Sequence, residues 1–341
     1  MAGDLASLGA WLARHVEGFR GPFALHRLAG GQSNPTYRIE AASGDYVLRR
    51  KPDGVLLPSA HAVDREHRVI GALHAAGFPV PRAHGYCDDA AVMGTPFFVM
   101  EFVPGRIFFD PRLPGVPPAE RAALFDAMNA TLAALHRIDP AAIGLGDYGR
   151  PGNYMARQVE RWTRQYRASE TERIEAMERL IEWLPRRLAA ADDAAVSIVH
   201  GDCRMDNFVF HPEEPRVVAV LDWELSTLGS PLADFAYNVL AWRIPPGLFR
   251  GMEGEDLAAL GIPAEADYVA AWCRRTGREG FPALDVYAAF NLFRLAAIMQ
   301  GIMKRVLDGT AAGEDAEANG RLAAPTAALA WEQALRAEGG G

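Results

Sequence analysis

Residues 199–207 read VHGDCRMDN, and this stretch decides how the rest of the sequence is interpreted. Downstream, residues 220–224 read VLDWE. In each segment an aspartate follows closely on apolar residues, and Asn207 lies five positions after Asp202. A carboxylate can accept a hydroxyl proton, and a second carboxylate with an amide oxygen can hold Mg²⁺ on phosphates. We therefore interpret Asp202, Asn207 and Asp222 as candidates for a phosphoryl-transfer site.

Composition limits the class of protein. The chain has 341 residues, which suggests two domains or one domain of two lobes. Hydrophobic residues make up 50% and charged residues 23%, so a wholly disordered chain is excluded. The formal net charge of −8 argues against a protein that wraps nucleic acid, and we expect no nucleic-acid partner.

Cysteine usage and apolar stretches bear on the compartment. The three cysteines stand far apart without a CxxC pair, which favours a reducing environment. The N-terminal residues do not resemble a secretory signal. Residues 290–303 are apolar but short and interrupted by polar side chains, so we expect no membrane span. A cytoplasmic location is the resulting expectation.

Hydrophobic patterning predicts an α+β chain. Residues 62–76 have helical spacing, whereas the segments after Pro104-Gly105 read mainly as longer helices with a β hairpin among them. We predict a small β-rich lobe over 1–103 and a larger helical lobe over 104–341. The predicted strands of the first lobe are 23–28, 36–40, 46–49 and 97–103.

The two motifs resemble the aminoglycoside phosphotransferase family, whose members share the protein-kinase-like fold. HGDCRMDN corresponds to the family pattern His-Gly-Asp-x-x-x-x-Asn, and VLDWE to the strand and loop that follow it. The resemblance implies that Asp202 is the catalytic base, that His200 orients the loop, and that Asn207 and Asp222 are metal ligands. Asp206 departs from the glycine that is commoner there. The resemblance extends over about residues 22–310.

The resemblance also extends to a nucleotide site in the first lobe. Residues 30–34, GGQSN, look like the phosphate-covering loop, with Gly31, Ser33 and Asn34 near the phosphates. Arg49 occupies the place of the kinase lysine, with Lys51 as its competitor.

Four acidic or apolar positions complete the implied set. Glu66 resembles the helix glutamate that pairs with the phosphate-binding cation. Glu101 and Val103 mark the strand and hinge that would hold adenine through backbone groups. Asp234, in the PLADFA segment, is interpreted as a structural brace of the catalytic loop.

The acceptor is harder to derive. Residues 287–299 form an apolar helix that carries Arg294, which is interpreted either as plain core or as a wall of the acceptor site. Such a wall, with the acidic residues spread out, would suit an acyl or anionic acceptor better than a polycation. The loop, strand and HGD motifs also resemble a subgroup associated with acyl-CoA dehydrogenases. We expect an ATP- and Mg²⁺-dependent kinase for a hydroxyl of a small molecule. A true aminoglycoside kinase, a non-catalytic nucleotide-binding protein and a protein kinase remain alternatives, and the oligomeric state stays open.

Overall fold

The computed structural model describes residues 5–28, 34–53, 61–150, 152–191, 194–311 and 315–339. Within them the chain divides into two compact units. Unit 1 comprises residues 1–106, 143–145 and 209–226, and unit 2 comprises 107–142, 146–208 and 227–341. The sequence predicted a boundary after residue 103, with the 209–226 segment in the helical lobe. In the structure this segment instead packs with the N-terminal residues.

Unit 1 is built on an antiparallel sheet in the order β1-β2-β3-β5-β4. Burial alternates along β2, where Tyr37 and Ile39 point inward, as expected of a strand with one covered face. In β3 the last five residues are all buried, so this central strand is covered on both faces. The strands are β1 Phe23–Arg27, β2 Thr36–Ala41, β3 Gly44–Arg50, β4 Ala83–Cys87 and β5 Phe97–Glu101.

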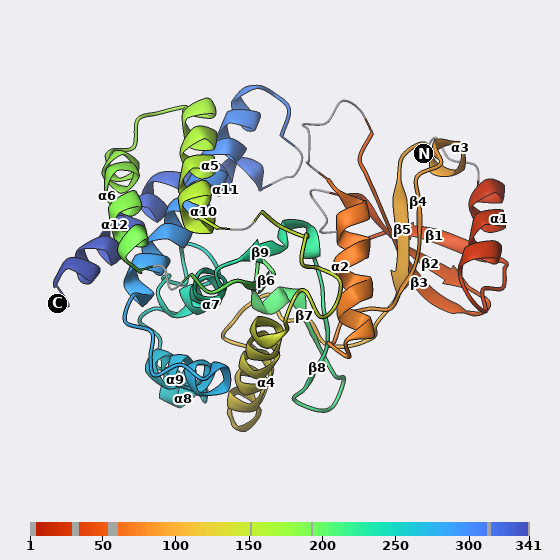
Figure 1. The fold of residues 1–341 in the computed structure, drawn as a ribbon, viewed down its shortest axis with the longest axis horizontal. Helices are drawn as coiled ribbons and strands as arrows, with labels where there is room; N and C mark the ends of the chain where they lie inside the picture. The colour runs from red at the N-terminus through yellow and green to blue at the C-terminus, as the bar shows by residue number, and fades with distance from the viewer. Residues whose placement is uncertain are drawn as a thin grey trace. The chain divides into compact units, whose positions relative to one another are not determined.

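Helices cover both faces of this sheet (Figure 1). On one face α1, Leu5–His15, buries Leu8, Trp11 and Leu12 in a cluster with Ile39 and Val99. The short helix α3, Ala90–Met93, packs against α1. On the other face α2, Val63–Ala75, contacts β4 and β5 and buries one apolar stripe. The sequence analysis predicted α2 but not α1, α3 or β4.

The 209–226 segment joins unit 1 through local contacts. Strands β7, Phe208–Phe210, and β8, Val217–Val220, form a two-stranded sheet, and a single 3₁₀ turn, η2 Trp223–Leu225, follows. The Val220 N–H donates to Pro79 O over 2.8 Å, and the Trp223 ring meets Phe78 edge to face. Helix α2 also contacts η2. These contacts place the LDWE motif beside β3 and α2.

Unit 2 is mainly helical and surrounds α10, Leu284–Leu307. Helix α10 is long and apolar enough to pass a membrane-span test, yet 78% of its most apolar window is buried among the neighbouring helices. It is therefore the core helix of this unit. A short antiparallel pair, β6 Ser197–Val199 and β9 Thr227–Gly229, carries the HGD motif at its end.

The other elements of unit 2 pack around this centre. Helices α5, α6, α7, α11 and α12 contact α10, and α4 contacts α9 and β6. Their bounds are α4 Pro118–Arg137, α5 Tyr154–Ala168, α6 Glu175–Ala191, η1 Met205–Asn207, α7 Pro231–Val239, η3 Leu240–Trp242, α8 Leu257–Leu260, α9 Glu265–Thr276, α11 Ala316–Arg321 and α12 Ala323–Gly339.

Candidate active site

Asp234 organises the HGD loop of unit 2 from the first turn of α7. Its two carboxylate oxygens accept hydrogen bonds from the backbone N–H groups of His200 and Gly201, each over 2.8 Å. His136 Nε2 lies 3.1 Å from the same carboxylate. Gly201 has φ +84°, a conformation that side chains with a Cβ disfavour. The loop is thus fixed by a buried carboxylate, in the bracing position that the sequence indicated.

The charge on Asp234 is stabilised by its partners. Burial by itself raises the pKa of this carboxyl, but the hydrogen bond and charge of His136, with the neighbouring His200, outweigh burial and lower the pKa overall. Cys203 shares this environment: burial, together with the Asp234 charge, raises the pKa of its thiol well above the ordinary value. Cys203 is therefore a buried neutral thiol and not a nucleophile.

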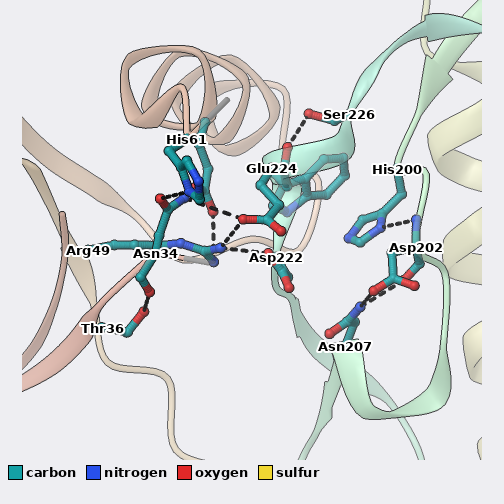
Figure 2. Close-up of polar contacts among 12 residues, drawn as sticks. Asn34, Thr36, Arg49, His61, His200, Asp202, Asn207, Asp222, Glu224 and Ser226 are labelled. Atoms are coloured by element: carbon teal, nitrogen blue, oxygen red, sulfur yellow. Dashed lines mark hydrogen bonds and ion pairs between the residues drawn. The ribbon is translucent and has the colours of Figure 1, made fainter. Parts of the chain in front are cut away.

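Asp202 follows the braced loop and receives several donors, of which Figure 2 shows Asn207. Tyr237 Oη donates to Asp202 Oδ1 over 2.8 Å, and Arg204 lies against both carboxylate oxygens at 3.0 and 3.1 Å. Asn207 Nδ2 donates to Oδ2 over 3.2 Å. Burial raises the pKa of Asp202, but Arg204, Tyr237 and further neighbours lower it more, so the carboxyl is held ionised.

His200 and Asn207 are both buried and both contact Asp202. His200 Nδ1 accepts a hydrogen bond from the Asp202 backbone N–H over 3.2 Å. Asn207 Nδ2 also donates to the Asp202 carbonyl oxygen over 2.7 Å. This contact directs the amide nitrogen of Asn207 toward Asp202 and leaves its oxygen as the ligand atom that a cation would use.

Arg49 is the centre of the polar group in unit 1 (Figure 2). It extends from β3, its side chain is 9% exposed, and its Nη1 lies 3.0 Å from Glu66 Oε1 on α2. Its Nη2 lies 2.8 Å from Asp222 Oδ1 and 2.9 Å from Glu224 Oε2. Lys51 is not part of this group. The structure thus brings Arg49, Glu66 and Asp222 together, whereas the sequence paired Arg49 with Glu66 only.

One guanidinium therefore faces three carboxylates. Burial disfavours the charged form of Arg49, but Glu66, Asp222 and Glu224 together raise its pKa. Burial raises the pKa of Glu66, while the Arg49 guanidinium 3.0 Å away acts in the opposite direction and favours the carboxylate. Both Glu66 oxygens are buried without a side-chain hydrogen bond of good geometry. The excess of acidic groups suits a site that takes up a cation.

Asn34 adds a fully buried amide to the group. Its Nδ2 donates to Glu224 Oε2 over 3.4 Å, and its Oδ1 lies 3.0 Å from His61 Nδ1. Glu224 belongs to the LDWE motif, but neither it nor His61 was assigned a role from the sequence. No sequence motif singles out His61. Gly31 and Ser33 lie outside the described residues.

Two further features of unit 1 concern predicted positions. Asp222 adopts φ +65°, a left-handed conformation that aspartate and asparagine tolerate better than most residues.

Glu101 ends β5 opposite Tyr46, three residues along the strand from the Phe98–Arg49 pair. Its carboxylate accepts from the Arg82 N–H over 3.1 Å. Val103 follows β5 and is half-buried. Glu101 and Val103 therefore lie apart from the Arg49 group.

A pocket opens beside Asp202 within unit 2. It holds about 530 Å³ of empty space, part of it open to solvent. Its apolar wall includes Phe109, Phe125, Met128, Trp242 and Phe249, and its polar wall includes Arg204, Asp206, Tyr237 and Arg250. Tyr237 and Arg204 are also direct partners of Asp202. The pocket is thus an apolar cavity with charged groups beside the ionised carboxylate.

Helix α10 contributes little to this pocket. Only Leu295 of the helix lines it. Arg294 instead donates to the Gly201 carbonyl oxygen and lies over the rings of Trp162 and Tyr237, 5.4 and 5.1 Å from their centroids. Of the two interpretations of residues 287–299, the structure shows α10 as mainly core, with Arg294 supporting the catalytic loop.

Among the described residues, no group of three or more His, Cys, Asp or Glu side chains is arranged to hold a metal ion. The oxygen ligands that are present still fit Mg²⁺. This ion binds proteins through one or two carboxylates and completes its shell with water and phosphate oxygens. Asp222 in unit 1 and Asn207 in unit 2 supply ligand atoms of that type.

The fold and these side chains define a small-molecule phosphotransferase with the kinase-like α+β architecture. The chain belongs to the phosphotransferase enzyme family (APH), whose family model matches residues 24–290. A crystal structure from Ralstonia eutropha JMP134, provisionally assigned as an aminoglycoside phosphotransferase, is 51% identical with a TM-score of 0.88 and covers 98% of each chain. The predicted fold class and the family resemblance are thereby confirmed.

Two more distant comparisons add detail. Acyl-CoA dehydrogenase family member 10 of Mus musculus is 48% identical over 318 residues, which are 93% of this chain and 30% of that protein. The chain thus spans less than a third of this relative's length. A variant of aminoglycoside phosphotransferase APH(4)-Ia, solved with ADP and hygromycin B, is 14% identical with a TM-score of 0.62 and covers 95% of this chain and 97% of that one. At that identity it shows the fold alone.

Proposed function

We propose that this protein transfers the γ-phosphate of ATP to a hydroxyl group of an amphipathic small molecule, in a Mg²⁺-dependent reaction. The observation that carries the proposal is Asp202, an ionised carboxylate whose partners Tyr237 and Arg204 line an apolar pocket. A carboxylate in this state is suited to orient a hydroxyl and to accept its proton. The complex of APH(4)-Ia with ADP supports ATP as the donor.

The roles of the other residues follow from their chemistry. Arg49, oriented by Glu66, binds phosphate oxygens, and Asn34 donates a hydrogen bond beside it. Asp222 and Asn207 would hold Mg²⁺, which when bound neutralises charge on the phosphate oxygens. His200 and Asp234 keep the loop that carries Asp202 in place.

The pocket favours an acceptor with an acyl or hydroxyacyl group over a polycation. Its wall is rich in aromatic side chains, and arginines stand beside Asp206. An aminoglycoside carries several ammonium groups and needs carboxylates around it, whereas an aliphatic chain gains free energy from burial against aromatic rings. The relative named as an acyl-CoA dehydrogenase family member supports an acyl-linked acceptor.

The test is an acceptor screen with the purified protein. It would measure Mg²⁺- and ATP-dependent phosphorylation of hydroxydecanoate, hydroxydecanoyl-CoA and kanamycin. We expect the hydroxyacyl compounds to be the better acceptors, and Asp202→Asn to lower turnover by about 10²–10⁴-fold. Comparable rates with kanamycin would contradict the acceptor class. If the wild-type protein bound ATP and Mg²⁺ but phosphorylated no acceptor, a non-catalytic nucleotide-binding role would be favoured.

A further inference from the structure

Three side chains donate hydrogen bonds to the carboxylate of Asp202. Oδ1 accepts from Tyr237 Oη at 2.8 Å and lies 3.0 Å from Arg204 Nε. Oδ2 accepts from Arg204 Nη2 at 3.1 Å and from Asn207 Nδ2 at 3.2 Å. A carboxylate offers about four acceptor positions in total. Three hydrogen bonds, with the Arg204 Nε also 3.0 Å from Oδ1, leave little room on this carboxylate, so a hydroxyl that is to donate its proton to Asp202 competes with these donors.

Two of the three donor side chains are fixed. Tyr237 is buried on α7, and its ring packs under the Arg294 guanidinium at 5.1 Å. Asn207 is 7% exposed, and its Nδ2 is also held by the Asp202 carbonyl oxygen at 2.7 Å. Moving either residue would disturb a buried contact and leave a polar group without a partner.

Arg204 differs from these two donors because it has a second carboxylate within reach. Its side chain is 27% exposed, and its Nη2 lies 3.7 Å from Asp206 Oδ2. Asp206 also forms an ion pair with Arg250. Arg204 and Arg250 both lie near the Phe249 ring, at 5.8 and 5.9 Å from its centroid. Arg204, Asp206, Phe249 and Arg250 all line the pocket.

We propose that Arg204 is a positioning residue that occupies Asp202 while the pocket is empty and turns to Asp206 when an acceptor hydroxyl arrives. Asp206, the residue that departs from the family pattern, is the alternative partner that makes this exchange possible. The guanidinium is paired with a carboxylate in both arrangements, so neither leaves an uncompensated buried charge. The hydroxyl replaces Arg204 at Asp202 and can then donate its proton there. This inference rests on the proposed function, because it concerns the same carboxylate and the same acceptor.

The exchange predicts a specific dependence between Arg204 and Asp206. Without the Asp206 charge, Arg204 has no second partner and stays on Asp202, so acceptors bind and react less well. Without the Arg204 guanidinium, Asp202 is already accessible, and the charge at position 206 no longer matters for access. If Asp206 had a merely structural role, its substitution would instead lower kcat/KM for the acceptor by the same factor with arginine or with glutamine at position 204.

A double-mutant cycle tests this dependence. The variants are Asp206→Asn, Arg204→Gln and the double variant, with Arg204→Lys as the conservative variant that keeps a charge. Asp126→Asn is the matched control, because Asp126 pairs with Arg275 on the surface outside the pocket. The assay measures kcat and KM for hydroxydecanoyl-CoA and for ATP at saturating Mg²⁺, and urea unfolding checks that each variant is folded.

We expect Asp206→Asn to lower kcat/KM for the acceptor by about fivefold to tenfold in the Arg204 background and by less than about twofold in the Arg204→Gln background. The KM for ATP should stay unchanged in Asp206→Asn. In the Arg204→Lys background the effect of Asp206→Asn should return in part, since lysine keeps the charge. Equal effects of Asp206→Asn in both backgrounds, or no effect in either, would overturn the exchange. Absence of transfer by the wild-type protein to any acceptor would instead overturn the proposed function itself.

Discussion

Arg49 Nη1 and Glu66 Oε1 lie 3.0 Å apart, with 9% and 1% of their side chains exposed. This ion pair joins the central strand β3 to helix α2. Two more carboxylates, Asp222 and Glu224, contact the same guanidinium at 2.8 and 2.9 Å. The pair therefore does more than join two elements, because Glu66 also orients the Arg49 guanidinium toward Asp222 and Glu224.

Glu66→Gln is predicted to weaken nucleotide binding more than it weakens the fold. The amide keeps the shape of the side chain but removes the charge that orients Arg49. We expect KM for ATP to rise by about tenfold or more, the effect of losing one charge-assisted contact. Kinetics at varied ATP and thermal unfolding would measure the two effects. Glu160→Gln is a suitable control, because its ion pair with Arg164 lies on the surface of α5. An unchanged KM for ATP would contradict the role of Arg49.

Asp222 is predicted to control the dependence on Mg²⁺. Asp222→Asn preserves the left-handed backbone, which has φ +65°, because asparagine tolerates this conformation. It removes one negative ligand, so the Mg²⁺ concentration for half-maximal rate should rise by about tenfold or more. Asp222→Ala should in addition lower stability, since alanine disfavours this φ. Titration of activity with MgCl₂ after EDTA treatment measures the first effect. A metal requirement equal to that of the wild type would exclude Asp222 as a ligand.

Asp234 is predicted to stabilise unit 2 in a pH-dependent way. Its folded-state pKa is lowered, so its stabilisation is present above the unfolded-state pKa of about 3.9 and is lost as the pH falls through the folded-state value. In Asp234→Asn an NH₂ group replaces one of the two acceptor oxygens, so one buried backbone N–H of the HGD loop loses its acceptor. The substitution should lower the unfolding free energy by about 2–4 kcal/mol at pH 7.

Urea unfolding at several pH values measures this contribution. The difference in unfolding free energy between wild type and Asp234→Asn should be largest near neutral pH and should become smaller toward pH 3. A difference that grows as the solution is acidified would contradict the ionised state of Asp234. Asp126→Asn, at the surface, should show little difference at any pH.

Phe249 is predicted to contribute to acceptor affinity. It is half-buried in the wall of the pocket. Phe249→Ala should raise KM for an acyl-bearing acceptor by about tenfold, as expected from the loss of one aromatic contact area, and should leave KM for ATP unchanged. Leu307→Ala is the matched control, because Leu307 is 67% exposed and does not line the pocket. Equal KM values for wild type and Phe249→Ala would place the acyl group elsewhere.

Much of the site could be predicted from the sequence because its residues belong to short local motifs. Asp202 and Asn207 lie on one loop, and their spacing alone requires them to be close. The pair of Arg49 and Glu66 followed from resemblance, and the structure brings the two side chains together. The partners Tyr237 and Arg250 could not be predicted, because they approach the loop from segments distant in the chain and belong to no recognised pattern.

The sequence by itself determined the family, through the resemblance of its HGD and LDWE segments to the family pattern, and it determined the α+β composition through hydrophobic periodicity. Tertiary structure alone decided that residues 209–226 pack with unit 1, since Val220 bonds to Pro79 and Trp223 meets Phe78. It also decided that Arg294 contacts the Gly201 carbonyl oxygen and that the pocket with Arg204 and Tyr237 in its wall is built mainly from other elements than α10. Such pairings depend on how distant segments bury their apolar faces together, and no local pattern specifies them.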